Sequence, residues 1–161
     1  MTEWSSPQQA ERFVENYADP VLRLCLTYSL SREDAQDICQ DIFLKLLERR
    51  QQFESLDHER AYIFRMAINA CKNLLKSPGR RRVVPMEQAE LIPAPAGEGW
   101  ELLEQIRSLP EHYGAVVYLF YYEGYSLEEV AKLCSCTPAT ARKRLSRSRK
   151  LLAKELGVAT V

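Results

Sequence analysis

The chain has 161 residues, 46% of them hydrophobic, and its 22 basic residues balance 22 acidic ones. This length allows one ordinary domain or two small ones, and the apolar content favours a packed core over disorder. No apolar run approaches the ~18 residues of a membrane span, and no signal peptide is visible at the N-terminus, so we expect a cytoplasmic protein with no direct membrane insertion.

Helical patterns fill the chain up to about residue 76, without strand-like alternation or hairpin turns. Ser31 is expected to cap a helix, with an acid three residues later, and the apolar stripe of that helix is Ile38, Ile42 and Leu46. A second stripe on the same helix is mostly acidic: Asp34, Asp37, Asp41, Lys45 and Glu48. This acidic face is either solvated or docks on a basic partner surface.

The next helix is expected from about His58 to Lys76, with a core stripe of Ile63, Ala67, Ala70 and Leu74. Another face of this helix is polar and basic: Arg65, Asn69, Lys72 and Lys76, extended by Arg80, Arg81 and Arg82. Three aromatic residues lie nearby in sequence: Phe53, Tyr62 and Phe64. Basic and aromatic side chains together suit single-stranded nucleic acid, although a solvated helix gives the same pattern.

Residues 77–99 break the helical pattern. They contain seven of the chain's fourteen prolines and glycines, which marks a linker. Helical periodicity resumes near Trp100 and continues to Leu156. The sequence therefore predicts an all-α chain: two small helical domains, 1–77 and 100–161, joined by a flexible Pro/Gly-rich linker, 78–99.

The second domain begins with core helices. Leu109-Pro110-Glu111 is expected to open a helix that ends at Gly124, with a broad apolar face. That face packs under the elements that follow and consists of Val116, Val117, Phe120 and Tyr121. The tyrosines of this stretch are expected to be packing residues: Tyr118, Tyr121, Tyr122 and Tyr125.

A helix-turn-helix is expected next. Ser126 and Glu129 form a capping box at the start of a short helix. One face of this helix is apolar, formed by Leu127, Val130, Ala131 and Cys134. A turn of about three residues follows, and Ser135 stands in it where many such motifs have glycine. Thr137-Pro138 then restarts a helix, with threonine as the N-cap and proline at the first helical position.

The last helix has a narrow apolar seam and is otherwise basic or polar. The seam consists of Ala141, Leu145, Ser148 and Leu152, while residues 137–154 contain seven basic side chains and no acid. Such a helix suits the major groove of DNA, where arginine can bind guanine and basic side chains neutralise phosphates. Residues near its start would meet bases most easily: Thr140, Arg142 and Lys143. Those further along divide between bases and backbone: Arg144, Arg147 and Arg149.

The five cysteines are an odd number, which argues against a disulfide framework. Cys134 and Cys136 are too close for the usual zinc-knuckle spacing and have no histidine nearby. We expect reduced thiols that pack as small hydrophobes, with redox sensing by this pair as the alternative. No nucleophilic triad, phosphate-binding loop or metal-ligand cluster is apparent, so the sequence predicts no enzyme, no cofactor and no small-molecule substrate.

Five segments in chain order resemble extracytoplasmic-function (group 4) sigma factors of the sigma-70 family. Residues 37–45 resemble the segment that grips the clamp helices of RNA polymerase, and residues 62–69 look like the family's W-L-x-R-I-A-x-N helix with tyrosine in place of tryptophan. Three further segments are similar to the family's S-L-P-E, x-G-x-S-x-E-E-I-A and T-V-K-S-R-L motifs: 108–111, 123–131 and 140–145.

The resemblance implies a protein that carries core RNA polymerase to promoter DNA. The first domain would bind the polymerase clamp through Asp37, Gln40, Asp41 and Lys45. It would then melt and bind the −10 element through Phe53, Arg65, Asn69 and Lys72, with Phe53 and Asn69 around a base flipped from the non-template strand. The second domain would read the −35 element through Thr140, Arg142, Lys143, Ser146 and Arg147. Regulation by an anti-sigma factor is also implied.

A stand-alone transcriptional regulator is the alternative interpretation. It would use the same helix-turn-helix and would bind duplex DNA as a dimer on a palindrome. The N-terminal half favours the sigma factor, because such a regulator has no need of an acidic helix followed by a basic one that contains asparagine.

Overall fold

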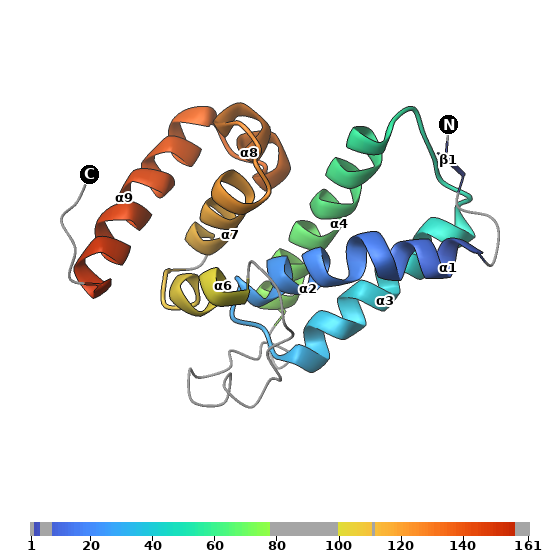
Figure 1. Ribbon diagram of the computed structural model, residues 1–161, viewed down its shortest axis with the longest axis horizontal. Helices are drawn as coiled ribbons and strands as arrows, with labels where there is room; N and C mark the ends of the chain where they lie inside the picture. Colours follow the sequence, from blue (N-terminus) through green and yellow to red (C-terminus); the bar gives the residue numbers. More distant parts are fainter. Residues whose placement is uncertain (1, 4–7, 78–99, 111, 157–161) are drawn as a thin grey trace. The chain divides into compact units, whose positions relative to one another are not determined.

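A computed structural model describes residues 2–3, 8–77, 100–110 and 112–156 (Figure 1). The chain divides into two compact units, Met1–Cys25 with Leu30–Val83 and Leu26–Ser29 with Val84–Val161. The expected all-α architecture is confirmed for the described residues, in which the helices are accompanied by two strands of two residues each. The predicted linker, 78–99, lies outside the described residues.

The two short strands belong to the first unit and were not predicted. β1 (Thr2–Glu3) pairs antiparallel with β2 (Gln52–Phe53), and Thr2 stands opposite Phe53. A pairing of two residues is too short to create a detectable alternation of apolar and polar side chains.

A long helical run begins the described part of the first unit: α1 (Gln8–Phe13), the π-helical turn η1 (Val14–Ala18) and α2 (Asp19–Leu26). The wide turn ends at Ala18, two residues before Pro20. In a regular α-helix the ring of Pro20 would clash with the carbonyl of Asn16, and a π-helical turn relieves such a clash by widening the helix. The side chain of Asn16 donates a hydrogen bond to the Arg12 carbonyl oxygen at 3.0 Å.

α3 (Arg32–Glu48) begins as predicted. The Ser31 side chain accepts a hydrogen bond from the Asp34 backbone N–H at 3.1 Å. The predicted stripe of Ile38, Ile42 and Leu46 is buried.

α4 (Leu56–Lys76) begins two residues earlier than predicted, because Ser55 rather than a later residue caps it. Of its predicted core stripe, Ile63 and Ala67 are fully buried, whereas Ala70 and Leu74 are only half-buried. The rest of the buried face was missed: Phe64, Ile68, Cys71 and Leu75. The predicted core stripe covered only part of the buried face, because α4 packs against α3 and also contacts the N-terminal helical run.

Glu59, near the start of α4, is a fully buried carboxylate held by two side chains of the N-terminal run. Arg12 donates two hydrogen bonds to it, at 2.8 and 2.7 Å, and the Tyr17 hydroxyl donates a third at 2.5 Å. Burial and the hydrogen bond to Glu59 raise the pKa of Tyr17 above its ordinary value. This bidentate pair with an added phenol compensates a charge that would be costly to bury alone.

The five cysteines are free thiols, four of them buried and Cys136 half-buried, in agreement with the sequence analysis. A hydrogen bond with Cys71, together with burial, raises the pKa of Cys25 well above its usual value. Burial raises the pKa of Cys39 to about 12. These thiols therefore stay protonated and unreactive.

The second unit contains α6 (Trp100–Ile106), α7 (Tyr113–Val117), the π-helical turn η2 (Tyr118–Tyr122), α8 (Leu127–Cys134) and α9 (Pro138–Leu156). The helix expected from Leu109 begins only at Tyr113, because His112 has a φ of +74° and cannot continue a right-handed helix. It ends as predicted before Gly124, whose φ is +80°.

The helix-turn-helix is confirmed. Ser126 and Glu129 form a complete capping box at the start of α8, and three residues separate α8 from α9. The Thr137 hydroxyl accepts a hydrogen bond from the Thr140 backbone N–H at 3.1 Å, so threonine caps α9 as expected.

Ser135, in the turn, has a φ of +55°, a left-handed conformation that favours glycine. We expect Ser135→Gly to raise the free energy of unfolding by about 0.5–1 kcal/mol, since relief of strain exceeds the entropy that glycine loses on folding. Denaturant titration measures the change. The control is Ser146→Gly, within α9, which should be destabilising. A loss of stability in Ser135→Gly would contradict the expectation.

Candidate nucleic-acid and polymerase interfaces

α9 is anchored by a narrow seam. Ala141, Leu145 and Ser148 are buried, and the Ser148 hydroxyl donates to the Arg144 carbonyl oxygen at 2.7 Å. Four of the five residues predicted to read the −35 element are exposed: Arg142, Lys143, Ser146 and Arg147. The fifth, Thr140, is half-buried, and its hydroxyl accepts a hydrogen bond from Thr137 at 2.9 Å. One helix thus presents four polar or basic side chains to solvent.

The charge of α9 is not neutralised within the described residues, where no carboxylate pairs with its basic side chains. Two tyrosines contact it instead, one from α7 and one from η2. Tyr113 accepts a hydrogen bond from Arg147, and Tyr121 accepts one from Arg149. A helix with this unpaired positive charge can bind a polyanion such as the DNA backbone.

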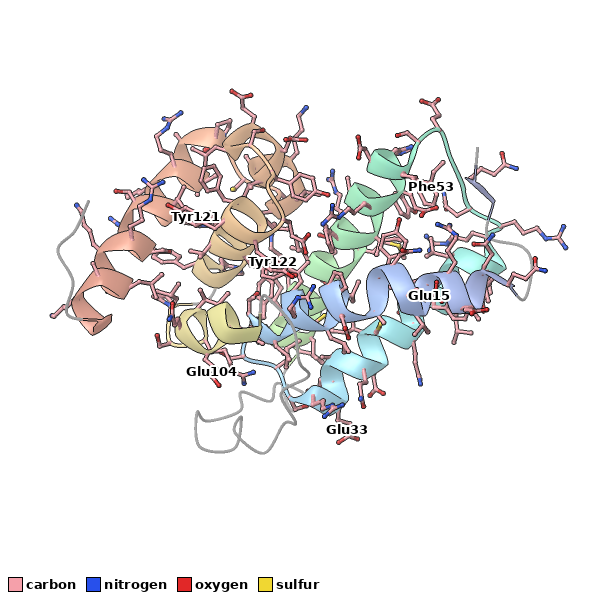
Figure 2. The ribbon with its side chains drawn as sticks, in the orientation of Figure 1. Glu15, Glu33, Phe53, Glu104, Tyr121 and Tyr122 are labelled. Carbon is pink, nitrogen blue, oxygen red and sulfur yellow. The ribbon has the colours of Figure 1, made fainter. Side chains whose placement is uncertain are left out.

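Tyr121 was predicted to be a packing residue, and this prediction was wrong. Its side chain is 51% exposed and lies beside α9 (Figure 2). Tyr118 is fully buried as expected, and Tyr122 stacks on it with ring centres 5.2 Å apart. The apolar pattern alone could not separate these neighbours, because the π-helical turn changes the direction of each side chain.

In the first unit, the outer face of α4 carries the predicted polar stripe. Arg65 and Asn69 are exposed and Lys72 is half-buried. His58 and Tyr62 precede them at helical spacing on the same face. The sequence analysis gave no role to His58, although its i, i+4 spacing to Tyr62 was a usable signal.

Phe53 was expected to lie at a flipped base, but its ring is only 1% exposed. It packs edge-on to His58 and Tyr62, with ring centres 5.3 and 5.2 Å away (Figure 2). Phe64, the other nearby aromatic, is fully buried. In this conformation Phe53 therefore supports the two surface rings of α4 and is not itself a stacking platform.

α3 presents its acidic face to solvent. Asp37, Gln40 and Asp41 are exposed, and Lys45 is half-buried and pairs with Asp41 at 3.0 Å. Leu44 lies among them and is 53% exposed, a feature that the charge pattern did not predict.

The described part of the chain contains no group of three or more His, Cys, Asp or Glu side chains that could hold a metal ion. Among the same residues, no helix is both long and apolar enough to cross a membrane.

Comparison with known proteins identifies two regions of the chain. The family model for sigma-70 region 2 matches residues 13–81, and that for sigma-70 region 4 matches residues 100–152. The chain is 27% identical to the ECF RNA polymerase sigma-E factor of Haemophilus influenzae, over 89% of this chain and 85% of the relative. It is 28% identical to the RNA polymerase sigma-H factor of Pseudomonas aeruginosa, over 89% and 83%.

Among solved structures, the sigma factor RpoE from Bartonella quintana, in complex with the anti-sigma factor NepR, has a similar fold. The TM-score is 0.68 at 20% sequence identity, covering 95% of this chain and 99% of that one. The two region matches together span most of the sequence, in the order that the family requires. The chain therefore belongs to the sigma-70 family and is an RNA polymerase sigma factor of the extracytoplasmic-function group.

Proposed function

We propose that the two charged surfaces divide the work of promoter recognition between domains 1–77 and 100–161, joined by the linker 78–99. The first domain binds core RNA polymerase and opens the −10 element, and the second reads the −35 element. The observation that supports this most strongly is that one chain has both an exposed acidic face, on α3, and a basic face without carboxylate partners in the described residues, on α9. The protein acts in the cytoplasm without catalysing a reaction and needs no cofactor.

The −35 element is read by α9. Arg142 and Lys143 are exposed near its start, and Ser146 and Arg147 are exposed at its middle. The N-terminal residues of a recognition helix contact base edges. Thr140 contributes to the cap of the helix, and its role is to fix where the helix enters the groove. Arginine suits guanine through two hydrogen bonds, and the remaining basic side chains suit phosphates.

The −10 element is held by the outer face of α4. Arg65 and Lys72 attract the backbone of the non-template strand, and Asn69 can donate to and accept from a base that has left the stack. Phe53 contributes indirectly, because its buried ring packs against His58 and Tyr62 and fixes these two rings at the end of this face. Aromatic surface rings beside basic groups are typical of single-strand binding.

Core polymerase is bound by α3. Asp37, Gln40, Asp41 and Lys45 form the polar part of the surface, and Leu44 adds an apolar contact at its centre. Acidic groups of this kind steer association with a basic partner surface and fix its register.

An anti-sigma factor is the proposed regulator. The RpoE structure contains such a partner, and this chain exposes an acidic surface and a basic one that a single inhibitor could cover. Covering both would block polymerase and DNA together.

Run-off transcription tests the proposal. The purified chain is mixed with bacterial core RNA polymerase and a genomic promoter library, and discrete transcripts are expected. Asp41→Lys should reduce transcript yield about tenfold or more, because it places like charges across the polymerase interface. The matched control is Glu15→Lys, the same charge change at an exposed site on η1 (Figure 2).

Equal transcript yields from Asp41→Lys and Glu15→Lys would remove α3 from the polymerase interface. A chain that gives no transcripts and no polymerase binding, but binds a palindromic duplex alone as a dimer, would be a stand-alone regulator.

A further inference from the structure

Two tyrosines of α7 and η2 reach across to two arginines of α9. The Tyr113 hydroxyl accepts a hydrogen bond from Nη1 of Arg147 at 3.3 Å. The Tyr121 hydroxyl accepts one from Nε of Arg149, whose guanidinium carbon also lies 5.5 Å from the centre of the Tyr121 ring. Figure 2 shows Tyr121 on the side of η2 that faces α9. Each arginine is thus held by a neighbouring helix before any DNA is bound.

The chemistry of the acceptor matters. A phenol oxygen accepts a hydrogen bond without a negative charge, whereas a carboxylate in its place would form an ion pair and cancel the charge that attracts phosphate. Glu123, the acid that follows η2, accepts a hydrogen bond from the Tyr118 hydroxyl at 2.6 Å. In the described residues no acid pairs with a cation of α9. The tyrosines therefore order the two arginines and leave their charge intact.

The two contacts use different parts of each guanidinium group, which has five N–H donors in a fixed fork. In Arg147 the bond to Tyr113 uses Nη1 and leaves the edge formed by Nε and Nη2, which can bind guanine bidentately. In Arg149 the bond to Tyr121 uses Nε and leaves the end formed by the two Nη groups, which suits a phosphate. Being two residues apart, the arginines lie on different sides of α9.

We propose that Tyr113 and Tyr121 are positioning residues of the −35 interface: Tyr113 presents Arg147 to a base and Tyr121 presents Arg149 to a phosphate. The proposal rests on the function proposed above for α9. Its physical basis is preorganisation, since an arginine ordered in advance loses less conformational entropy when DNA binds.

The test measures the dissociation constant of the reconstituted holoenzyme for a promoter fragment recovered by run-off transcription, over a range of salt concentrations. Tyr113→Phe and Tyr121→Phe keep the rings and lose only the acceptors, so each should weaken binding about three- to tenfold. Both should leave the salt dependence of binding unchanged. Arg149→Ala should instead lower the slope of log binding constant against log salt concentration by about one, because one phosphate contact is lost. Tyr113→Phe should also reduce discrimination against a substituted −35 element, which a general loss of folding would not do.

Tyr122→Phe is the matched control, because it removes the hydroxyl of a neighbouring tyrosine whose ring stacks on Tyr118; it should keep wild-type affinity. In an Arg147→Ala background, Tyr113→Phe should have no further effect. The positioning role would be overturned if Tyr113→Phe lowered promoter affinity equally with and without Arg147. It would also be overturned if Arg147→Ala weakened binding and Tyr113→Phe alone did not. If Arg147→Ala and Arg149→Ala leave affinity unchanged, then α9 does not read the promoter, and the underlying function falls as well.

Discussion

Replacing Glu59 with alanine is expected to lower the free energy of unfolding of the first unit by about 3 kcal/mol. Loss of one partner of a buried ion pair leaves the other charge uncompensated, which typically costs about 3–5 kcal/mol. We expect the lower end of this range because the Arg12 side chain is 25% exposed and can recover some hydration. Tyr17 also loses the acceptor of its buried hydroxyl.

Urea titration of the full chain, followed by far-ultraviolet circular dichroism, measures this loss. The control is Glu54→Ala, because Glu54 is an exposed acid just before α4 and its loss should change stability by less than about 0.5 kcal/mol. A Glu59→Ala variant as stable as Glu54→Ala would mean that the cluster adds nothing to the fold.

The double substitution Arg142→Ala with Arg147→Ala is expected to weaken promoter binding by the holoenzyme by about 2–6 kcal/mol. Each bidentate contact between arginine and guanine contributes about 1–3 kcal/mol of discrimination, and both side chains are exposed on α9. The loss of binding free energy should be smaller on a promoter whose −35 element is scrambled, because the wild-type protein makes few base-specific contacts with that promoter either.

Competition binding with intact and scrambled promoters measures both values. Lys154→Ala is the matched control, since Lys154 is an exposed base of α9 about 18 Å along the helix from Arg142. Equal losses on the two promoters would assign Arg142 and Arg147 to the DNA backbone and not to bases.

Local chemistry made several elements predictable from the sequence. A serine or threonine cap acts within three residues, so Ser31, Ser126 and Thr137 could be assigned without knowledge of the fold. The same holds for the seam of α9, whose spacing follows from one helix alone. The acidic and basic faces were also visible, because charge patterns on a helix survive folding when they face solvent.

Residues whose surroundings come from distant parts of the chain could not be placed. Phe53 is buried by His58 and Tyr62 and by the pairing of its strand with β1. Glu59 was unremarkable in the sequence, and its partner Arg12 lies 47 positions away. His112 broke the expected helix through a left-handed backbone that an ordinary residue rarely adopts. Each of these outcomes depends on tertiary contacts, which override local propensity.

Pro20 has an effect at a distance from its own position. In a regular α-helix, Arg12 and Tyr17 would point about 140° apart, being five residues from each other. The i→i+5 turn at Val14–Ala18 brings residues of that spacing nearly into line, so both side chains converge on Glu59. The wide turn therefore offsets the five-residue spacing of Arg12 and Tyr17, which a regular α-helix would not do. Replacing Pro20 with alanine would remove the clash that favours this wide turn, and a regular helix in its place would separate the two donors, although the substitution changes no side chain that touches Glu59.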